Sequence, residues 1–74
     1  MFIHTYKSRN RENYHVAAFT LQKGMYELVS EWCHQTFGEP GDCKHGARWE
    51  DGLWFGEAWF RDEQDLMTFV LRWS

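Results

Sequence analysis

Residues 54–73 constrain the fold of this chain more than any other segment, because they predict a strand that runs directly into a helix. The first half of the segment is rich in aromatic side chains, which favour a strand. Asp62 is a good N-cap for the helix, and Asp65 stands at its N3 position, as in a capping box. The apolar residues that follow are spaced as one helix face: Leu66, Phe69, Val70 and Trp73. Residues 70–73 also suit a closing strand, because periodicity over four residues cannot separate the two structures.

The same segment holds three of the five tryptophans. That is more aromatic surface than a chain of 74 residues can easily hide, since a domain of this size buries only about 60% of its unfolded surface. Each Phe, Tyr or Trp side chain covers roughly 150–250 Å² when it is buried. We therefore expect a compact module whose remaining aromatic surface recognises another macromolecule.

A hairpin is predicted just before the helix. Asp51-Gly52 favours a type I′ turn, which would join a strand over residues 47–50 to one over residues 53–60. Both faces of the second strand are apolar, so one face packs on the helices and the other on something else. We expect the face with two small residues to point inward, because a helix can approach it closely: Trp54, Gly56, Ala58 and Phe60. The outward face then carries Leu53, Phe55, Glu57 and Trp59.

Two short strands are predicted near the N-terminus. Residues 2–7 and 14–20 are rich in β-branched and aromatic side chains, although Ala17-Ala18 also suits a helix. Residues 8–13 between them are polar and basic, so they predict a loop.

A first helix is predicted from about residue 21 to residue 37. Thr20 can cap its start by accepting a hydrogen bond from the first turn. Gly24 weakens that turn by about 1 kcal/mol relative to alanine. Gly38 and, two residues later, Pro40 mark its end. Its apolar face consists of Met25, Leu28, Val29, Trp32 and Thr36.

The order of these elements predicts an α+β fold in one domain, residues 1–74. The order ββαββα favours an antiparallel sheet of three to four strands with two helices packed on one face. If residues 14–20 form the first core strand and residues 70–73 the last, the order becomes the ferredoxin-like βαββαβ unit.

Charge is unevenly distributed along the chain. The net charge is −3, but residues 27–65 alone contain ten acidic and three basic side chains. An acidic surface repels nucleic acid and attracts basic protein surfaces. A nucleic-acid patch at Lys7, Arg9 and Arg11 is the opposing hypothesis, and the acidic remainder of the chain argues against it.

The sequence also limits the compartment and the chemistry. No apolar run approaches the roughly 18 residues that cross a membrane, and the N-terminus lacks the pattern of a signal peptide. Two cysteines without such a signal favour a reducing cytoplasm. No glycine-rich phosphate loop or other strong catalytic motif is present in the sequence, so we expect a protein that is not an enzyme and has no cofactor.

One set of residues suits a metal ion and is the alternative to that expectation. Cys33, Cys43 and His45, with His34 as a fourth candidate, carry the thiolate and imidazole groups that tetrahedral zinc prefers. The set lacks the usual paired spacing, and the neighbours Cys33 and His34 would point about 100° apart on a helix. A small zinc-stabilised domain is therefore the second hypothesis.

Six side chains are expected to contact a partner protein: Phe55, Glu57, Trp59, Glu50, Asp51 and Glu63. Aromatic side chains are favoured contact anchors, and the acids would steer the chain to a basic surface. Glu57, within an aromatic strand, must face solvent, pair with a base such as Arg48, or meet the partner. A second copy of the chain could cover the same face and form a homodimer.

The C-terminal pattern resembles the ending of many small tailed-phage proteins. In those proteins an aromatic strand is followed by a short helix with an acidic cap and by a Phe-x-Leu-x-Trp terminus. Here the pattern is Trp59-Phe60, then Asp65-Leu66, then Phe-Val-Leu-Arg-Trp over residues 69–73. The resemblance covers only the last quarter of the chain. It implies a phage-encoded accessory protein that works in the host cytoplasm and inhibits a host enzyme or defence complex, but it carries over no catalytic or binding residue.

Overall fold

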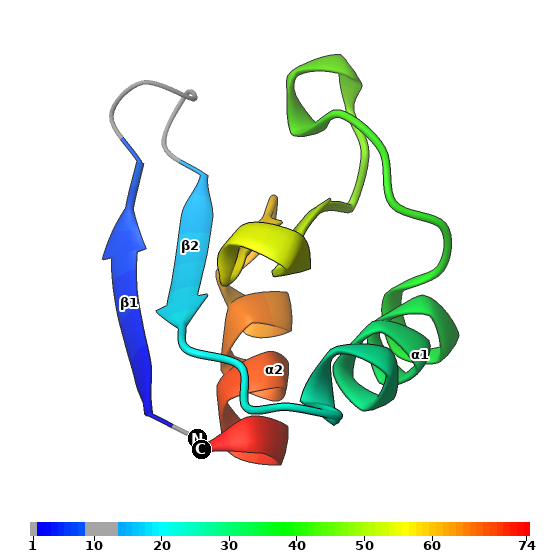
Figure 1. The fold of residues 1–74 in the computed structure, drawn as a ribbon. Coiled ribbons are helices and arrows are strands. Elements are labelled where there is room, and N and C mark those ends of the chain that lie inside the picture. The colour runs from blue at the N-terminus through cyan, green and yellow to red at the C-terminus, as the bar shows by residue number, and fades with distance from the viewer. Residues whose placement is uncertain (1, 9–13) are drawn as a thin grey trace.

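The computed structural model describes residues 2–8 and 14–74 of the chain. Most of the loop predicted over residues 8–13 lies outside this part. The main elements run strand, strand, helix, strand, strand, helix (Figure 1). They are β1 (Ile3–Lys7), β2 (His15–Phe19), α1 (Met25–Phe37), β3 (Trp49–Gly52), β4 (Glu57–Phe60) and α2 (Glu63–Trp73). Two short 3₁₀ turns, η1 (Cys43–His45) and η2 (Leu53–Phe55), precede and follow β3.

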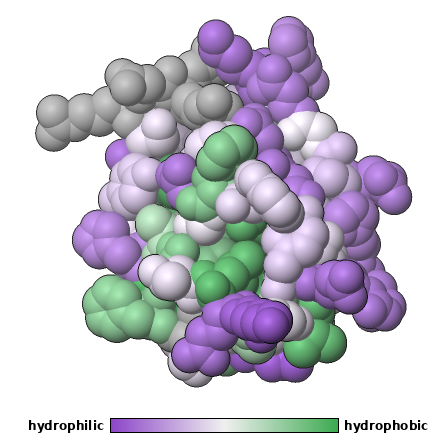
Figure 2. Space-filling view, in the orientation of Figure 1, coloured by the Kyte–Doolittle hydropathy of each residue, from purple (hydrophilic) through white to green (hydrophobic). Residues whose placement is uncertain are grey.

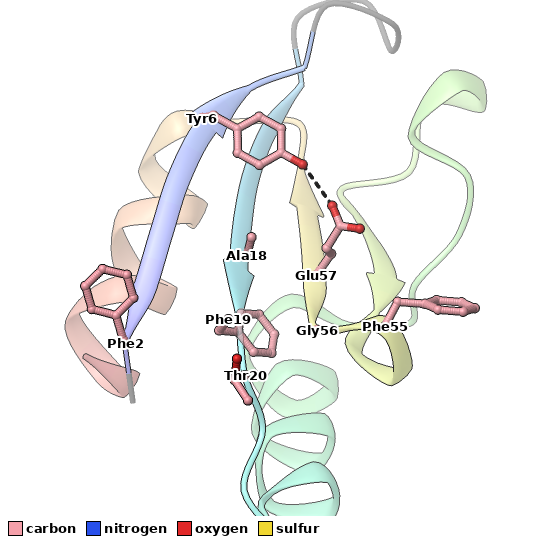
Figure 3. A pocket seen from close by; sticks show the side chains of 8 residues that line it. All are labelled: Phe2, Tyr6, Ala18, Phe19, Thr20, Phe55, Gly56 and Glu57. Carbon is pink, nitrogen blue, oxygen red and sulfur yellow. Dashed lines mark hydrogen bonds between the residues drawn. The ribbon is translucent and has the colours of Figure 1, made fainter.

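Within the described residues, the four strands form one antiparallel sheet in the order β1-β2-β4-β3. Both helices pack on one face of this sheet, behind the strands as drawn in Figure 3. The predicted α+β fold and the order ββαββα are therefore confirmed. The ferredoxin-like alternative is wrong, because residues 70–73 continue α2, in which Trp73 extends the buried face of Leu66 and Phe69.

The hydrophobic core lies between the helices and the facing side of the sheet. Ala17 and Ala58 are paired at the centre of the sheet and are fully buried. Their small side chains leave room for larger rings from the helices, as close packing requires. The rings of Phe37 and Phe60 lie 5.0 Å apart, and those of Phe60 and Phe69 lie 5.6 Å apart. This line of rings joins α1, β4 and α2 and adds aromatic contact energy to the burial of apolar area.

The predicted hairpin forms, but its turn lies at residues 53–56 and not at Asp51-Gly52. Both residues of that dipeptide belong to β3, where Gly52 pairs with Glu57 of β4. The chain then makes the 3₁₀ turn η2, and Gly56, with φ +79°, leads it into β4. Asp51 helps to start the turn, because its Oδ1 accepts a hydrogen bond of 3.0 Å from the Leu53 N–H.

This turn breaks the alternation that the sequence predicts over residues 53–60. Leu53 is fully buried in the core, whereas Trp54 is 79% exposed and Phe55 is 82% exposed. The prediction that Trp54 points inward and Leu53 outward is therefore wrong, since a 3₁₀ turn repeats every three residues and a strand every two. Within β4 itself the predicted faces are confirmed, because Ala58 and Phe60 are buried while the alternate residues are not.

Helix α1 begins later and ends where the sequence predicts. Its N-cap is Gly24, whose φ of +86° is left-handed and therefore outside the helix, and no side chain caps it. The predicted cap at Thr20 is wrong for that reason. The prediction that Gly24 weakens the helix relative to alanine is also wrong, because Gly24 lies outside the helix in a conformation that glycine adopts readily. At the other end, the N–H of Gly38 donates to the His34 carbonyl at 3.0 Å. The Gly38 carbonyl in turn accepts a hydrogen bond of 2.9 Å from the buried indole of Trp49, which ties the end of α1 to β3.

An ion pair joins the start of β3 to the first turn of α2. Arg48 donates from Nε and Nη2 to the two carboxylate oxygens of Asp65, at 2.7 and 3.0 Å. Asp65 is buried, and its hydrogen bonds raise the pKa of Arg48. The expected capping box does not form. The Asp65 carboxylate is hydrogen-bonded to Arg48, and Asp62 occupies the N-cap position without a side-chain hydrogen bond. The pair therefore fixes α2 to the sheet.

Gly56→Ala should destabilise the fold strongly. A Cβ atom at this position would lie 2.3 Å from the carbonyl oxygen of Phe19, and the φ of +79° is unfavourable for a residue with a side chain. Backbone strain of this kind costs about 1–3 kcal/mol, and the clash adds to it. We expect the free energy of unfolding to fall by about 3 kcal/mol or more, measured by urea unfolding with circular dichroism.

Gly24→Ala is the matched control for that substitution. Gly24 has a similar φ of +86°, but nothing lies within 4 Å of its Cβ position. Only the cost of the left-handed conformation remains, about 1–2 kcal/mol. Equal losses at the two glycines would contradict the close approach of Gly56 to β2.

Arg48→Met should destabilise the fold because it leaves the buried Asp65 carboxylate without its partner. Such a loss costs about 3–5 kcal/mol in a protein interior. We expect about 2 kcal/mol here, since the guanidinium itself is half exposed. In a double-mutant cycle with Asp65→Asn, the combined loss should be smaller than the sum of the single losses. Additive losses would show that the ion pair does not couple α2 to the sheet.

Candidate functional site

The candidate site lies on the face of the sheet opposite the helices, here called the outer face. Strand pairing places His4, Ala18 and Glu57 in one row across β1, β2 and β4. Residues that pair across strands point to the same side of a sheet. Because Ala18 is the smallest of the three, the surface of the sheet is depressed at the middle of the row.

A trough opens over this low centre. It has a volume of about 540 Å³ and is lined by Phe2, Tyr6, Ala18, Phe19, Thr20, Phe55, Gly56 and Glu57 (Figure 3). In Figure 3, Phe2 stands on the β1 side and Phe55 on the η2 side, with Ala18 between them. The trough therefore has aromatic rims and a floor of small residues.

A hydrogen bond spans one end of the trough. The phenol of Tyr6 on β1 donates to Oε2 of Glu57 on β4 at 2.9 Å, passing over β2 (Figure 3). This hydrogen bond raises the pKa of Tyr6, and partial burial and the charge of Glu57 act in the same direction. The predicted alternative that Glu57 pairs with Arg48 is wrong, because Arg48 is bound to Asp65.

Two exposed rings form a ridge beside the trough. Trp54 and Phe55 stand out from η2 because the 3₁₀ turn buries only Leu53 of its three residues. Trp54 makes an edge-on contact with the ring of Tyr26 on α1 at 5.7 Å between centroids. A second hollow of about 280 Å³ is lined by Trp54 and shares Phe19, Thr20, Phe55 and Gly56 with the trough. The ridge therefore stands beside two adjoining hollows.

The exposed apolar surface is larger than these two rings. Phe2 is 85% exposed, and Leu71 on α2 is 79% exposed. Figure 2 shows apolar side chains, in green, that reach the surface in the centre and lower left of the view, with hydrophilic side chains around them. Exposed aromatic side chains next to a hollow are typical of a surface that binds a partner.

The structure brings two of the predicted partner-binding residues, Phe55 and Glu57, into the trough. Trp59 and Glu50 pair with each other in the next row of the sheet and are only partly exposed. They contact η1, because the Cys43 N–H donates to Oε1 of Glu50 at 3.2 Å and its thiol lies 3.8 Å from the Trp59 carbonyl oxygen. They belong to a neighbouring region of the outer face.

The other two predicted residues are exposed but lie outside the trough. Asp51 uses its carboxylate to hold the Leu53 N–H, and Glu63 lies in the first turn of α2. Six further residues line the trough and were not predicted as members of the site: Phe2, Tyr6, Ala18, Phe19, Thr20 and Gly56. A signal was present for the first two, since Phe2, His4 and Tyr6 alternate in a predicted strand and so share one face.

The predicted metal ligands do not come together. Cys33 belongs to the hydrophobic core. Cys43 contacts Glu50 and Trp59, and its carbonyl accepts a hydrogen bond from the Tyr14 hydroxyl. His45 lies 3.2 Å from an oxygen of Asp42, and His34 bonds the Ser30 carbonyl at 2.8 Å. In the part of the chain that the structure describes, no three His, Cys, Asp or Glu side chains are placed to hold a metal ion.

The environment of Cys33 explains why it suits the core better than a metal. Burial raises the pKa of its thiol to about 12, with a further contribution from the charge of Asp51. Zinc binds the thiolate, so a thiol held neutral by its surroundings is a poor ligand. The packing of α1 on the sheet therefore accounts for this residue.

The structure bears only in part on the predicted nucleic-acid patch and on the expectation that no segment crosses a membrane. Arg9 and Arg11 of the predicted nucleic-acid patch lie outside the described residues. Among the helices that are described, none is long and apolar enough to span a membrane.

Comparisons with protein-family models, with curated proteins and with solved structures find no match to this chain.

Tyr6 should ionise at a higher pH than a free tyrosine. Because its folded-state pKa lies above the unfolded value of about 10, its bond to Glu57 stabilises the fold below that pH and is lost as the pH rises through the folded-state pKa. NMR of the protein with ¹³Cζ-labelled tyrosine follows the titration. Glu57→Gln should move the pKa of Tyr6 back towards its ordinary value, while Glu63→Gln should not. A pKa of Tyr6 that does not respond to Glu57→Gln would contradict the bond.

Proposed function

We propose that this protein is a small binding module, not an enzyme, and that it contacts another protein through the trough and the adjoining ridge. One observation carries the proposal. Phe2, Trp54 and Phe55 are each about four-fifths exposed around hollows at the same end of the sheet. Large rings held in water on a folded surface lose contact energy that a partner can restore.

Charge supports a basic partner. Glu57 lies in the trough, and residues 27–65 together carry seven more acidic than basic side chains. Such a surface is attracted to positive protein surfaces and repelled by nucleic acid. We therefore propose a partner with a basic face, such as the nucleic-acid channel of a nuclease or polymerase.

The biological setting that we propose comes from the C-terminal residues. The resemblance of residues 59–73 to the ends of small tailed-phage proteins suggests a phage-encoded inhibitor. It would act in the host cytoplasm by occupying a basic surface of a host enzyme or defence complex. A compact chain with an aromatic and acidic contact face suits such a role, because it can block a surface without any chemistry of its own.

Site-specific photo-crosslinking tests this function. A photoreactive benzoylphenylalanine in place of Phe55 should yield a discrete covalent adduct with a host protein in a lysate of host bacteria. The same residue in place of Leu71 is the control, since Leu71 is equally exposed but lies on α2, on the other side of the sheet. No adduct, or the same adducts from both positions, would contradict the proposal, and an adduct between two copies of the chain would point to a homodimer.

Affinity measurements give the quantitative form of the same test. Phe55→Ala should weaken binding to the captured protein by about 2 kcal/mol, the usual threshold for an interface hot spot. Leu71→Ala should leave the affinity unchanged. Both side chains are exposed, so both variants should keep the stability of the parent protein.

A further inference from the structure

We infer that the trough binds the guanidinium group of an arginine side chain that the partner projects from its surface. The inference rests on the proposed function and names the group that the site takes. Three features of the trough carry it: the carboxylate of Glu57, the rings on its rim and the small residues of its floor.

The Glu57 carboxylate provides the charge. Its Oε2 accepts the Tyr6 hydroxyl at 2.9 Å. Within the described chain, no hydrogen bond reaches Oε1 and no basic side chain pairs with Glu57. A partly buried carboxylate beside apolar rings has lost some of its water, so a cationic donor restores its hydrogen bonds with a charge-assisted one.

The protein's own arginines in the described part are engaged elsewhere. Arg48 is bound to Asp65, and Arg61 donates to the Gly46 carbonyl at 3.0 Å. Arg72 stacks over the ring of Trp73 at 4.2 Å. None of these three described arginines pairs with Glu57, so its carboxylate is open to a cation from another molecule.

The rings of the trough favour a guanidinium group over an ammonium group. Tyr6 is held beside the carboxylate by its bond to Glu57, and Phe2 stands on the β1 side, whereas the ring of Phe55 points away from Glu57 (Figure 3). A guanidinium group is planar and weakly hydrated, and it stacks on aromatic faces while it donates to a carboxylate. The ammonium of lysine is compact and strongly hydrated, so it loses more on entering such a site.

The small residues on the floor of the trough leave space for the aliphatic part of the arginine side chain. Ala18 has only a methyl group, and Gly56 has no side chain to fill the trough above it. The aliphatic part of an arginine can lie over these residues, as such stems do on apolar surfaces. A purely apolar group would cover Glu57 without pairing it, and an anion would be repelled.

A titration with a short peptide tests the site directly. The probe is acetyl-Gly-Arg-Gly-amide, and its partner is the same peptide with citrulline, which keeps the shape but not the charge. With ¹⁵N-labelled protein, the arginine peptide should shift the backbone amides of Ala18, Gly56 and Glu57, with a dissociation constant on the order of 10 mM. Equal shifts from the citrulline peptide, or shifts centred on Asp51 and Glu63, would overturn the inference.

Substitutions separate the carboxylate from the general acidity of the chain. Glu57→Gln should weaken arginine-peptide binding at least tenfold, whereas Glu63→Gln, which removes an exposed acid outside the trough, should not change it. Ala18→Leu should also abolish binding, because its side chain fills the floor of the trough from the outer face. Binding that survives both Glu57→Gln and Ala18→Leu would place the peptide elsewhere and overturn the inference.

Binding of the captured partner by these variants distinguishes the arginine site from the proposed function on which it rests. If Phe55→Ala weakens partner binding but Glu57→Gln does not, the binding module stands and the arginine site falls. If neither substitution affects a partner that still binds, the outer face is not the contact surface and both proposals fail. If both substitutions weaken it and the arginine peptide competes with the partner, the site is the one inferred here.

Discussion

The close approach of Gly56 to the end of β2 is the contact on which the rest of the outer face depends. The Phe19 N–H donates to the Gly56 carbonyl at 2.8 Å, and no side chain fits between the two strands at this point. This contact sets where β4 begins, so Glu57 falls in one row with Ala18. It also leaves η2 as a tight turn that buries Leu53 and exposes Phe55. A larger residue at position 56 would move the carboxylate and the ridge together.

The aromatic residues fall into two groups, one packed in the core and one exposed on the surface. Those on the helix side, such as Phe37, Phe60 and Phe69, pack ring against ring around the alanine pair at the centre of the sheet. This core is small but dense, as a short domain needs. Trp54 and Phe55, by contrast, remain outside the core and are exposed.

The trough combines this spare aromatic surface with one well-placed charge. The Tyr6 hydroxyl holds Glu57 across β2, so the carboxylate and the ring have a fixed relation before any ligand arrives. Preorganisation of this kind lowers the entropy cost of binding. We propose that the acidic character of the surrounding chain acts at longer range and steers a basic partner surface towards the site. Contact and steering thus come from different residues, which allows experiments to separate them.

The sequence by itself determined the class and order of the elements and the core-facing sides of β4 and α2. Local signals sufficed there, because Gly38 ends a helix in any context and the spacing of Leu66, Phe69 and Trp73 marks a helix face. On α1 the predicted face was wrong in part, because Leu28 is exposed and Cys33 and Phe37 are buried. Only the tertiary structure decided which way Trp54 points, where α1 starts and what Asp65 binds. The start of α1 depends on the left-handed backbone conformation of Gly24. The other two depend on contacts between distant segments, Gly56 against Phe19 and Arg48 against Asp65. The trough belongs to the same group, since its walls come from β1, β2 and the β3–β4 turn, which meet only when the sheet is assembled.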